Sequence, residues 1–122
     1  MKRILVIDDE PSVLRLLRVI LESSGYEVVE AVNGEEGMQL FHEADFDLVI
    51  IDMIMPVKDG LKTITEVLEK APKIPVIAIS GGGVVPKERY LTVASYLGNV
   101  WTISKPFGPE IITETVSELI GE

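Results

Sequence analysis

Short aliphatic runs alternate along the chain with longer segments in which apolar residues recur every three or four positions. Three of the runs are continuous and rich in β-branched residues: Ile4–Ile7, Leu48–Ile51 and Val76–Ile79. Runs of this kind are typical of strands that are buried on both faces of a parallel sheet. Two weaker strands are predicted at the valine-rich Glu27–Ala31 and at Val100–Ser104, which follows a Gly-Asn turn signal.

The segments between the strands have the periodicity of amphipathic helices. In the first segment one stripe is formed by Val13, Leu14, Leu17, Ile20 and Leu21. Pro11 suits the first position of this helix, and Gly25 suits its end. Similar patterns predict further helices at Gly34–Ala44, Leu61–Lys70, Pro86–Leu97 and Pro109–Ile120.

Strand and helix therefore alternate five times. This order predicts an α/β domain of the (βα)5 type, with a five-stranded parallel sheet and helices on both faces. No repeat or linker interrupts the 122 residues, so we expect a single domain over residues 1–122 with no output domain. In such sheets ligands bind beyond the carboxyl ends of the strands, where the strand order reverses.

Composition excludes several classes of function. The formal net charge of -9 opposes direct binding to nucleic acid or to an anionic membrane surface. The sequence has no cysteine, which rules out disulfides, thiolate metal sites and a cysteine nucleophile. We find neither a signal-peptide pattern nor an apolar run of membrane-spanning length, and we expect a cytoplasmic protein.

Polar residues gather where the predicted strands end. In chain order these residues are Asp8, Asp9, Glu10, Asp52, Ser80 and Lys105. They are far apart in the sequence, but the carboxyl ends of parallel strands share one edge of the sheet. We therefore expect three or more acids, one hydroxyl and one ammonium to meet there.

Crowded carboxylates raise one another's pKa and oppose folding unless a cation lies between them. Mg²⁺ prefers hard oxygen ligands, so Asp9 and Asp52 would supply carboxylates and the loop after Asp52 a backbone carbonyl. The alternative is that Asp8 to Glu10 only cap the first helix, whose N-terminus favours acids. Capping leaves Asp52 unexplained.

The other strand ends fit chemistry on a phosphoryl group. An aspartate beside a metal, such as Asp52, is a plausible nucleophile toward phosphorus. Ser80 can donate a hydrogen bond to a phosphoryl oxygen, and the Lys105 ammonium can neutralise one. Each residue also has an alternative without a functional role: a turn after the strand at Asp52, a flexible glycine loop after Ser80 and a solvated surface position for Lys105.

In this order the motifs IDDE, DMIMPVKDG, IS and SKPF resemble the receiver domain of two-component response regulators over essentially the whole chain. The resemblance implies the flavodoxin-like strand order 2-1-3-4-5 and a phosphoacceptor at Asp52. It implies Mg²⁺ bound by Asp9, Asp52 and the Ile54 carbonyl, with Asp8 acting through water. Ser80 and Lys105 would contact the acylphosphate, and the Lys105-Pro106 peptide would be cis.

The resemblance also implies partners. The phosphoryl donor would be a phosphohistidine on a sensor histidine kinase or a phosphotransfer protein. The downstream protein would bind a surface formed by the fourth helix, fifth strand and fifth helix. The chain would be a signalling protein that catalyses only its own phosphorylation and dephosphorylation, and not an enzyme in the usual sense.

Three alternatives remain open from the residues. A small Mg²⁺-dependent aspartyl-phosphate hydrolase would need a second acid two positions after Asp52, where the chain has Ile54. A flavin-binding module would need a first loop without the acids at Asp8 to Glu10, which repel a phosphate dianion. An interaction domain that never takes a phosphoryl group has no use for the full set of polar residues.

Overall fold

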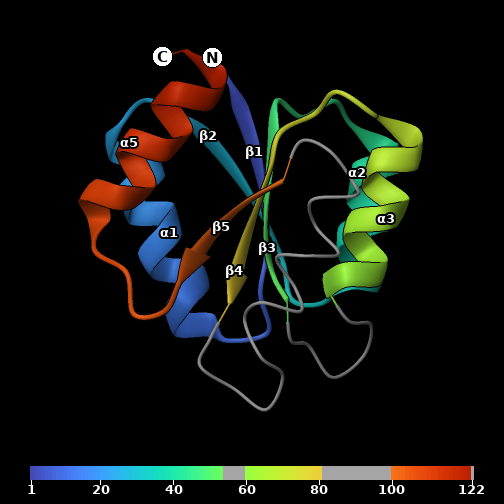
Figure 1. Ribbon diagram of the computed structural model, residues 1–122, viewed down its shortest axis with the longest axis horizontal. Coiled ribbons are helices and arrows are strands. Elements are labelled where there is room, and N and C mark those ends of the chain that lie inside the picture. The colour runs from blue at the N-terminus through green and yellow to red at the C-terminus, as the bar shows by residue number, and fades with distance from the viewer. Residues whose placement is uncertain (54–59, 81–99, 122) are drawn as a thin grey trace.

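The computed structural model of the protein describes residues 1–53, 60–80 and 100–121, and within these ranges strands and helices form a three-layer α/β fold (Figure 1). The strands are β1 (Arg3–Ile7), β2 (Glu27–Ala31), β3 (Leu48–Asp52), β4 (Val76–Ser80) and β5 (Val100–Ser104). The helices are α1 (Pro11–Ser23), α2 (Gly34–Glu43), α3 (Gly60–Lys70) and α5 (Pro109–Ile120). The predicted helix Pro86–Leu97 lies outside the described residues.

The five strands form one parallel sheet in the order β2-β1-β3-β4-β5. This is the flavodoxin-like order that the family resemblance implied, and it places the reversal of strand order between β1 and β3. Ile7 lies opposite Ile51 in the β1–β3 pair. The next residues of the two strands, Asp8 and Asp52, therefore lie side by side. On the other side of β3, Asp52 pairs with Ile79 of β4.

Both faces of the sheet are buried because alternate residues of each central strand point to opposite layers. Ile4, Val6 and Ile50 belong to the core beneath α1 and α5. Leu5 and Ile7 belong to the core beneath α2 and α3 on the other face. Figure 1 shows these helix pairs on opposite sides of the sheet. Two-sided burial explains why the central strands read as unbroken aliphatic runs.

The predicted element boundaries agree closely with the structure. The bounds of β2, β5 and α5 match the prediction residue for residue, and α1 begins at Pro11 as expected. Gly25 follows the end of α1 with φ of 92°, a left-handed conformation that favours glycine. The main difference is that Asp52 and Ser80 are the last residues of β3 and β4, because their backbones still pair with the neighbouring strands.

Each helix packs an apolar face against the sheet, although Leu16 and Val19 of α1 and Ile111 of α5 are exposed. Leu14, Leu17, Ile20 and Leu21 of α1 are buried, as the stripe predicted, and Asn33 caps α2 by accepting the Glu36 backbone N–H at 2.8 Å. None of the described helices combines the length and the apolar character that crossing a bilayer requires.

Candidate functional site at the carboxyl edge of the sheet

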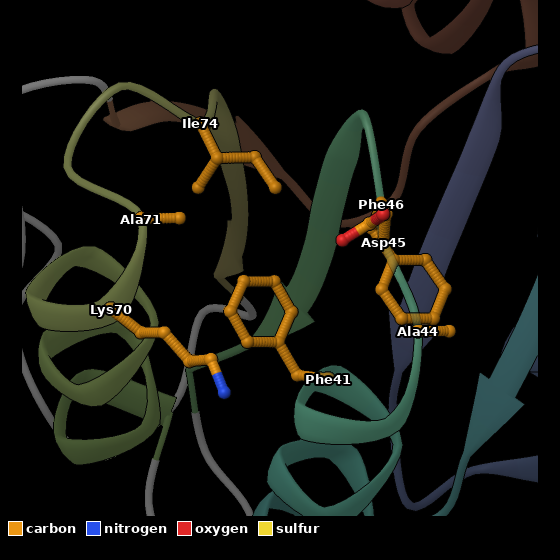
Figure 2. A pocket seen from close by; sticks show the side chains of 7 residues that line it. All are labelled: Phe41, Ala44, Asp45, Phe46, Lys70, Ala71 and Ile74. Atoms are coloured by element: carbon orange, nitrogen blue, oxygen red, sulfur yellow. The ribbon is translucent and has the colours of Figure 1, made fainter.

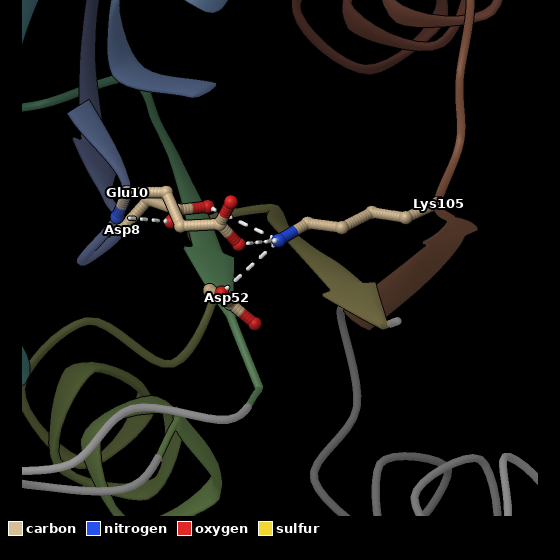
Figure 3. A network of polar contacts seen from close by, with 4 residues as sticks. All are labelled: Asp8, Glu10, Asp52 and Lys105. Carbon is tan, nitrogen blue, oxygen red and sulfur yellow. Dashed lines mark hydrogen bonds and ion pairs between the residues drawn. The ribbon is translucent and has the colours of Figure 1, made fainter. Parts of the chain in front are cut away.

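The polar residues predicted at the strand ends do meet at one edge of the sheet. Asp8 follows β1, Asp52 ends β3 and Lys105 follows β5, and Figure 3 shows their side chains converging together with that of Glu10. The carboxylates of Asp8, Asp9, Glu10 and Asp52 offer oxygen atoms that all lie within 4.8 Å of one another. The described part of the chain thus contains the acidic cluster that the sequence predicted.

Lys105 is the cation at the centre of the cluster. Its Nζ lies 3.2 Å from Asp52 Oδ2, 3.1 Å from Glu10 Oε1 and 3.8 Å from Asp8 Oδ2. The first two distances are hydrogen bonds that the ammonium donates. Lys105 precedes a cis peptide bond to Pro106, as the family resemblance implied.

The two aspartates next to Lys105 are buried. The side chain of Asp8 is 1% exposed and that of Asp52 is 6% exposed, whereas Asp9 is exposed. Asp8 is fixed because its backbone N–H donates to the Ala31 carbonyl at 3.1 Å and its Oδ1 accepts the Glu10 backbone N–H at 2.9 Å. A buried carboxylate so close to Asp52 is costly without a compensating cation.

Burial raises the pKa of Asp8 to about 6, against the backbone hydrogen bond from Glu10 that lowers it, and the charge of Asp52 raises it further. Burial also acts to lower the pKa of Lys105, but the hydrogen bond to Glu10 and the charges of Asp52 and Asp8 outweigh it. The pKa of Lys105 is therefore raised, and the lysine stays charged at neutral pH.

The acidic cluster fits a small divalent cation. Among the described residues, Asp8 Oδ2 is buried and accepts no hydrogen bond, although it faces Lys105. An unsatisfied buried oxygen beside three further carboxylates is the hard donor set that Mg²⁺ uses, with waters completing the shell. The predicted carbonyl ligand, Ile54, lies outside the described residues.

The alternative that the first acids only cap α1 does not account for Glu10. Glu10 is the N-cap residue of α1, but its side chain makes no cap hydrogen bond within the described structure and extends to Lys105 instead. The contact between Glu10 and Lys105 was not predicted from the sequence. The signal was available, since the start of α1 and the end of β5 share the same edge of the sheet.

Ser80 ends β4 at the same edge, and its backbone pairs with Ser104. Its hydroxyl lies outside the described side chains, so its predicted hydrogen bond to a phosphoryl oxygen stays a prediction. The segment 54–59, which carries most of the DMIMPVKDG motif, is also outside the described residues. The two residues that flank it are hydrogen-bonded to each other, because the Gly60 N–H donates to the Met53 carbonyl at 3.1 Å.

A separate hollow lies between the C-terminal ends of α2 and α3, at the opposite edge of the sheet (Figure 2). It has a volume of about 210 Å³ and is lined by Phe41, Ala44, Asp45, Phe46, Lys70, Ala71 and Ile74. The rings of Phe41 and Phe46 stack with centroids 6.1 Å apart. The hollow brings together one acid and one base on an apolar floor, and it shares no residue with the acidic cluster.

Comparison with known proteins gives the class to which this fold and site belong. The family of response regulator receiver domains matches residues 4–117, and the chain belongs to this family. It is 36% identical over 122 residues to Protein CcdB of Bacillus subtilis, covering 99% of each chain. It is 35% identical to the transcriptional regulatory protein ResD of the same organism, of which it spans 48% of the length.

The structural comparison agrees. The response regulator protein TrrA of Thermotoga maritima, whose structure is a complex with Mg²⁺-BeF, superposes with a TM-score of 0.85 at 34% identity over 98% of this chain and 99% of that one. Receiver domains are phosphoacceptor signalling modules of two-component systems. They interact with histidine kinases or phosphotransfer proteins and with downstream effectors. The family match and the structural superposition confirm the predicted fold and class of protein.

Proposed function

We propose that Asp52 is the phosphoacceptor and takes a phosphoryl group from a phosphohistidine of a sensor kinase or phosphotransfer protein. The observation that carries the proposal is the buried Asp52 carboxylate at the end of β3, 3.2 Å from the Lys105 ammonium and beside Asp8. Of the four clustered acids, Asp8 and Asp52 alone are buried, and Asp8 is already held by the Glu10 backbone.

In the transfer, an Asp52 carboxylate oxygen attacks phosphorus while the bond from phosphorus to the histidine nitrogen breaks. The electron pair of that bond leaves with the imidazole, and the phosphoryl group ends as an acylphosphate on Asp52. Lys105 would then neutralise one phosphoryl oxygen and Ser80 would donate a hydrogen bond to another. The fixed positions of Asp52 and Lys105 mean that little reorganisation precedes attack.

Asp9, Asp52 and the Ile54 carbonyl would hold Mg²⁺ directly, and Asp8 would hold it through water. When bound, the cation offsets negative charge on the transferring group. The unsatisfied Asp8 Oδ2 and the mutual distances of the four carboxylates support this assignment. The Mg²⁺-BeF complex of TrrA supports it by similarity.

We further propose that phosphorylation changes the surface formed by the predicted helix at residues 86–97, β5 and α5, and that a downstream protein binds there. Two large apolar side chains are exposed on the described part of this surface, Trp101 on β5 and Ile111 on α5, at 41% and 44%. Aromatic side chains such as that of Trp101 are enriched at protein interfaces. We also propose that the protein is located in the cytoplasm, where kinases supply the phosphoryl group. The absence of cysteine from the sequence agrees with this location.

The test is intact-mass spectrometry after incubation with acetyl phosphate and Mg²⁺. The wild-type chain should gain one phosphoryl group, and the Asp52→Ala variant should gain none. Asp45→Asn is the matched control, because Asp45 is exposed and precedes β3 at the opposite edge of the sheet. A labelled Asp52→Ala variant, or an unlabelled wild type, contradicts the proposal.

A further inference from the structure

Three carboxylates surround the ammonium group of Lys105, and two of them, Glu10 and Asp52, accept hydrogen bonds from it. A lysine ammonium carries three N–H donors and no acceptor. Glu10, Asp52 and Asp8 lie 3.1, 3.2 and 3.8 Å from Nζ, and Figure 3 shows the dashed contacts meeting at this one atom. A phosphoryl oxygen that binds Lys105 therefore competes with carboxylates that already hold two of its donors and share its charge.

The three carboxylates differ in how firmly they are placed. Asp8 and Asp52 are buried, and each directly follows a residue of the Ile7–Ile51 pair. Their backbones therefore cannot move apart without breaking the pairing of β1 with β3. Glu10 is different, because its side chain is 55% exposed and its backbone begins α1. The contact from Glu10 is the one that solvent can replace at low cost.

We propose that Glu10 is a positioning residue that holds Lys105 in the unphosphorylated state and competes with the phosphoryl group for its ammonium. The inference rests on the proposed function of Asp52 and Lys105 and adds a regulator of their affinity for the phosphoryl group. Glu10 and Lys105 are 95 positions apart, and their contact joins the start of α1 to the end of β5. Glu10 thus favours the unphosphorylated form.

The competition has a direction and a size. When Glu10 holds one N–H, its carboxylate competes with a phosphoryl oxygen for the donors and the charge of the ammonium group. Removing the carboxylate charge frees the donor, so the phosphorylated state gains relative to the unphosphorylated one. Because the Glu10 side chain is 55% exposed and that of Lys105 is 22% exposed, we expect roughly a two- to fivefold effect on affinity, in the range of measured surface ion pairs.

The experiment measures the dissociation constant of beryllofluoride, a phosphoryl analogue, by isothermal titration calorimetry with Mg²⁺ at saturation. Glu10→Gln keeps the size of the side chain and removes its charge, and should bind about two- to fivefold more tightly than wild type. Glu10→Asp keeps the charge but is one methylene shorter, and Lys105 cannot follow it without leaving Asp52. It should bind more tightly as well.

Glu43→Gln is the control for net charge, because Glu43 is exposed in the last turn of α2 at the opposite edge of the sheet. It should bind as wild type does. The inference is overturned if Glu10→Gln binds like wild type, or if Glu43→Gln binds equally tightly. It is also overturned if Glu10→Asp matches wild type while Glu10→Gln tightens, since Glu10 would then act only by repelling the anion. Absence of beryllofluoride binding to wild type would instead reject the proposed function itself.

Discussion

Replacing Asp8 by asparagine should stabilise the protein at neutral pH, even though Asp8 belongs to the functional cluster. Asp8 is 1% exposed, and its carboxylate is buried near Asp52 and Glu10. Asparagine has nearly the same shape and keeps a side-chain oxygen that can accept the Glu10 backbone N–H. The substitution therefore removes a buried negative charge while it preserves the local hydrogen bond.

The magnitude follows from the pKa of Asp8. Burial raises this pKa from 3.8 to about 6. Because one pKa unit corresponds to about 1.4 kcal/mol, the difference between the folded and unfolded pKa is worth about 3 kcal/mol. This pKa is already net of the charge of Lys105, which lowers it, so the loss of the 3.8 Å ion pair in the variant is included in the figure.

The sign with pH follows from linkage. The raised pKa means that between about pH 4 and pH 6 the folded state binds the Asp8 proton more strongly than the unfolded state does. The stability that this proton contributes is fully present below the unfolded pKa and is lost as pH rises through the folded pKa. The variant lacks this dependence, so its advantage over wild type should grow by up to about 3 kcal/mol from pH 4 to pH 7.

The assay is urea denaturation followed by circular dichroism, for both proteins, in chelator and across this pH range. Subtracting the two free energies of unfolding removes the titration of the other acids. Saturating Mg²⁺ should reduce the difference in stability at pH 7, because the cation compensates the charge of Asp8, which only the wild type carries. A difference that is independent of pH, or an Asp8→Asn variant that is less stable than wild type at pH 7, refutes this reasoning.

Three further substitutions test how the elements are held together, each by urea denaturation. Gly60→Ala should lower the free energy of unfolding by about 1–3 kcal/mol and impair phosphorylation. A Cβ there would lie 2.3 Å from the Asp52 carbonyl oxygen, a backbone atom that cannot move easily. Gly108→Ala should cost much less, because no described atom lies within 4 Å of the added Cβ. Leu17→Ala should cost about 2–5 kcal/mol, since Leu17 is fully buried between α1 and the sheet, and a loss below about 1 kcal/mol would contradict this packing. Arg18→Ala should cost less than about 1 kcal/mol, because its bonds to Glu22 and Glu30 lie at the surface, and a larger loss would show that the pair network is coupled to the core.

Much of the fold was predictable because its signals are local. Two-sided burial requires continuous aliphatic strands, and the run Ile4–Ile7 meets that requirement without reference to any partner strand. The helix Pro109–Ile120 was predicted to the residue, since a proline suits its first turn and Gly121 ends it with φ of 69°. The rule that strand ends share one edge then selected Asp8, Asp52 and Lys105.

Tertiary structure alone decided the properties that make the acids unequal. Asp8 and Asp9 are neighbours of the same type in the sequence, but Asp8 is buried with a raised pKa and Asp9 is exposed. The difference arises because Asp8 directly follows Ile7, which pairs with Ile51, and is buried there, whereas Asp9 lies one residue further on and is exposed. This strand pairing joins segments that are distant in the sequence. The contact of Glu10 with Lys105 has the same origin, since it spans 95 positions. The sequence by itself determined which groups reach the edge of the sheet, because periodicity is a local property; their depth, partners and charge states were decided only when the strands paired.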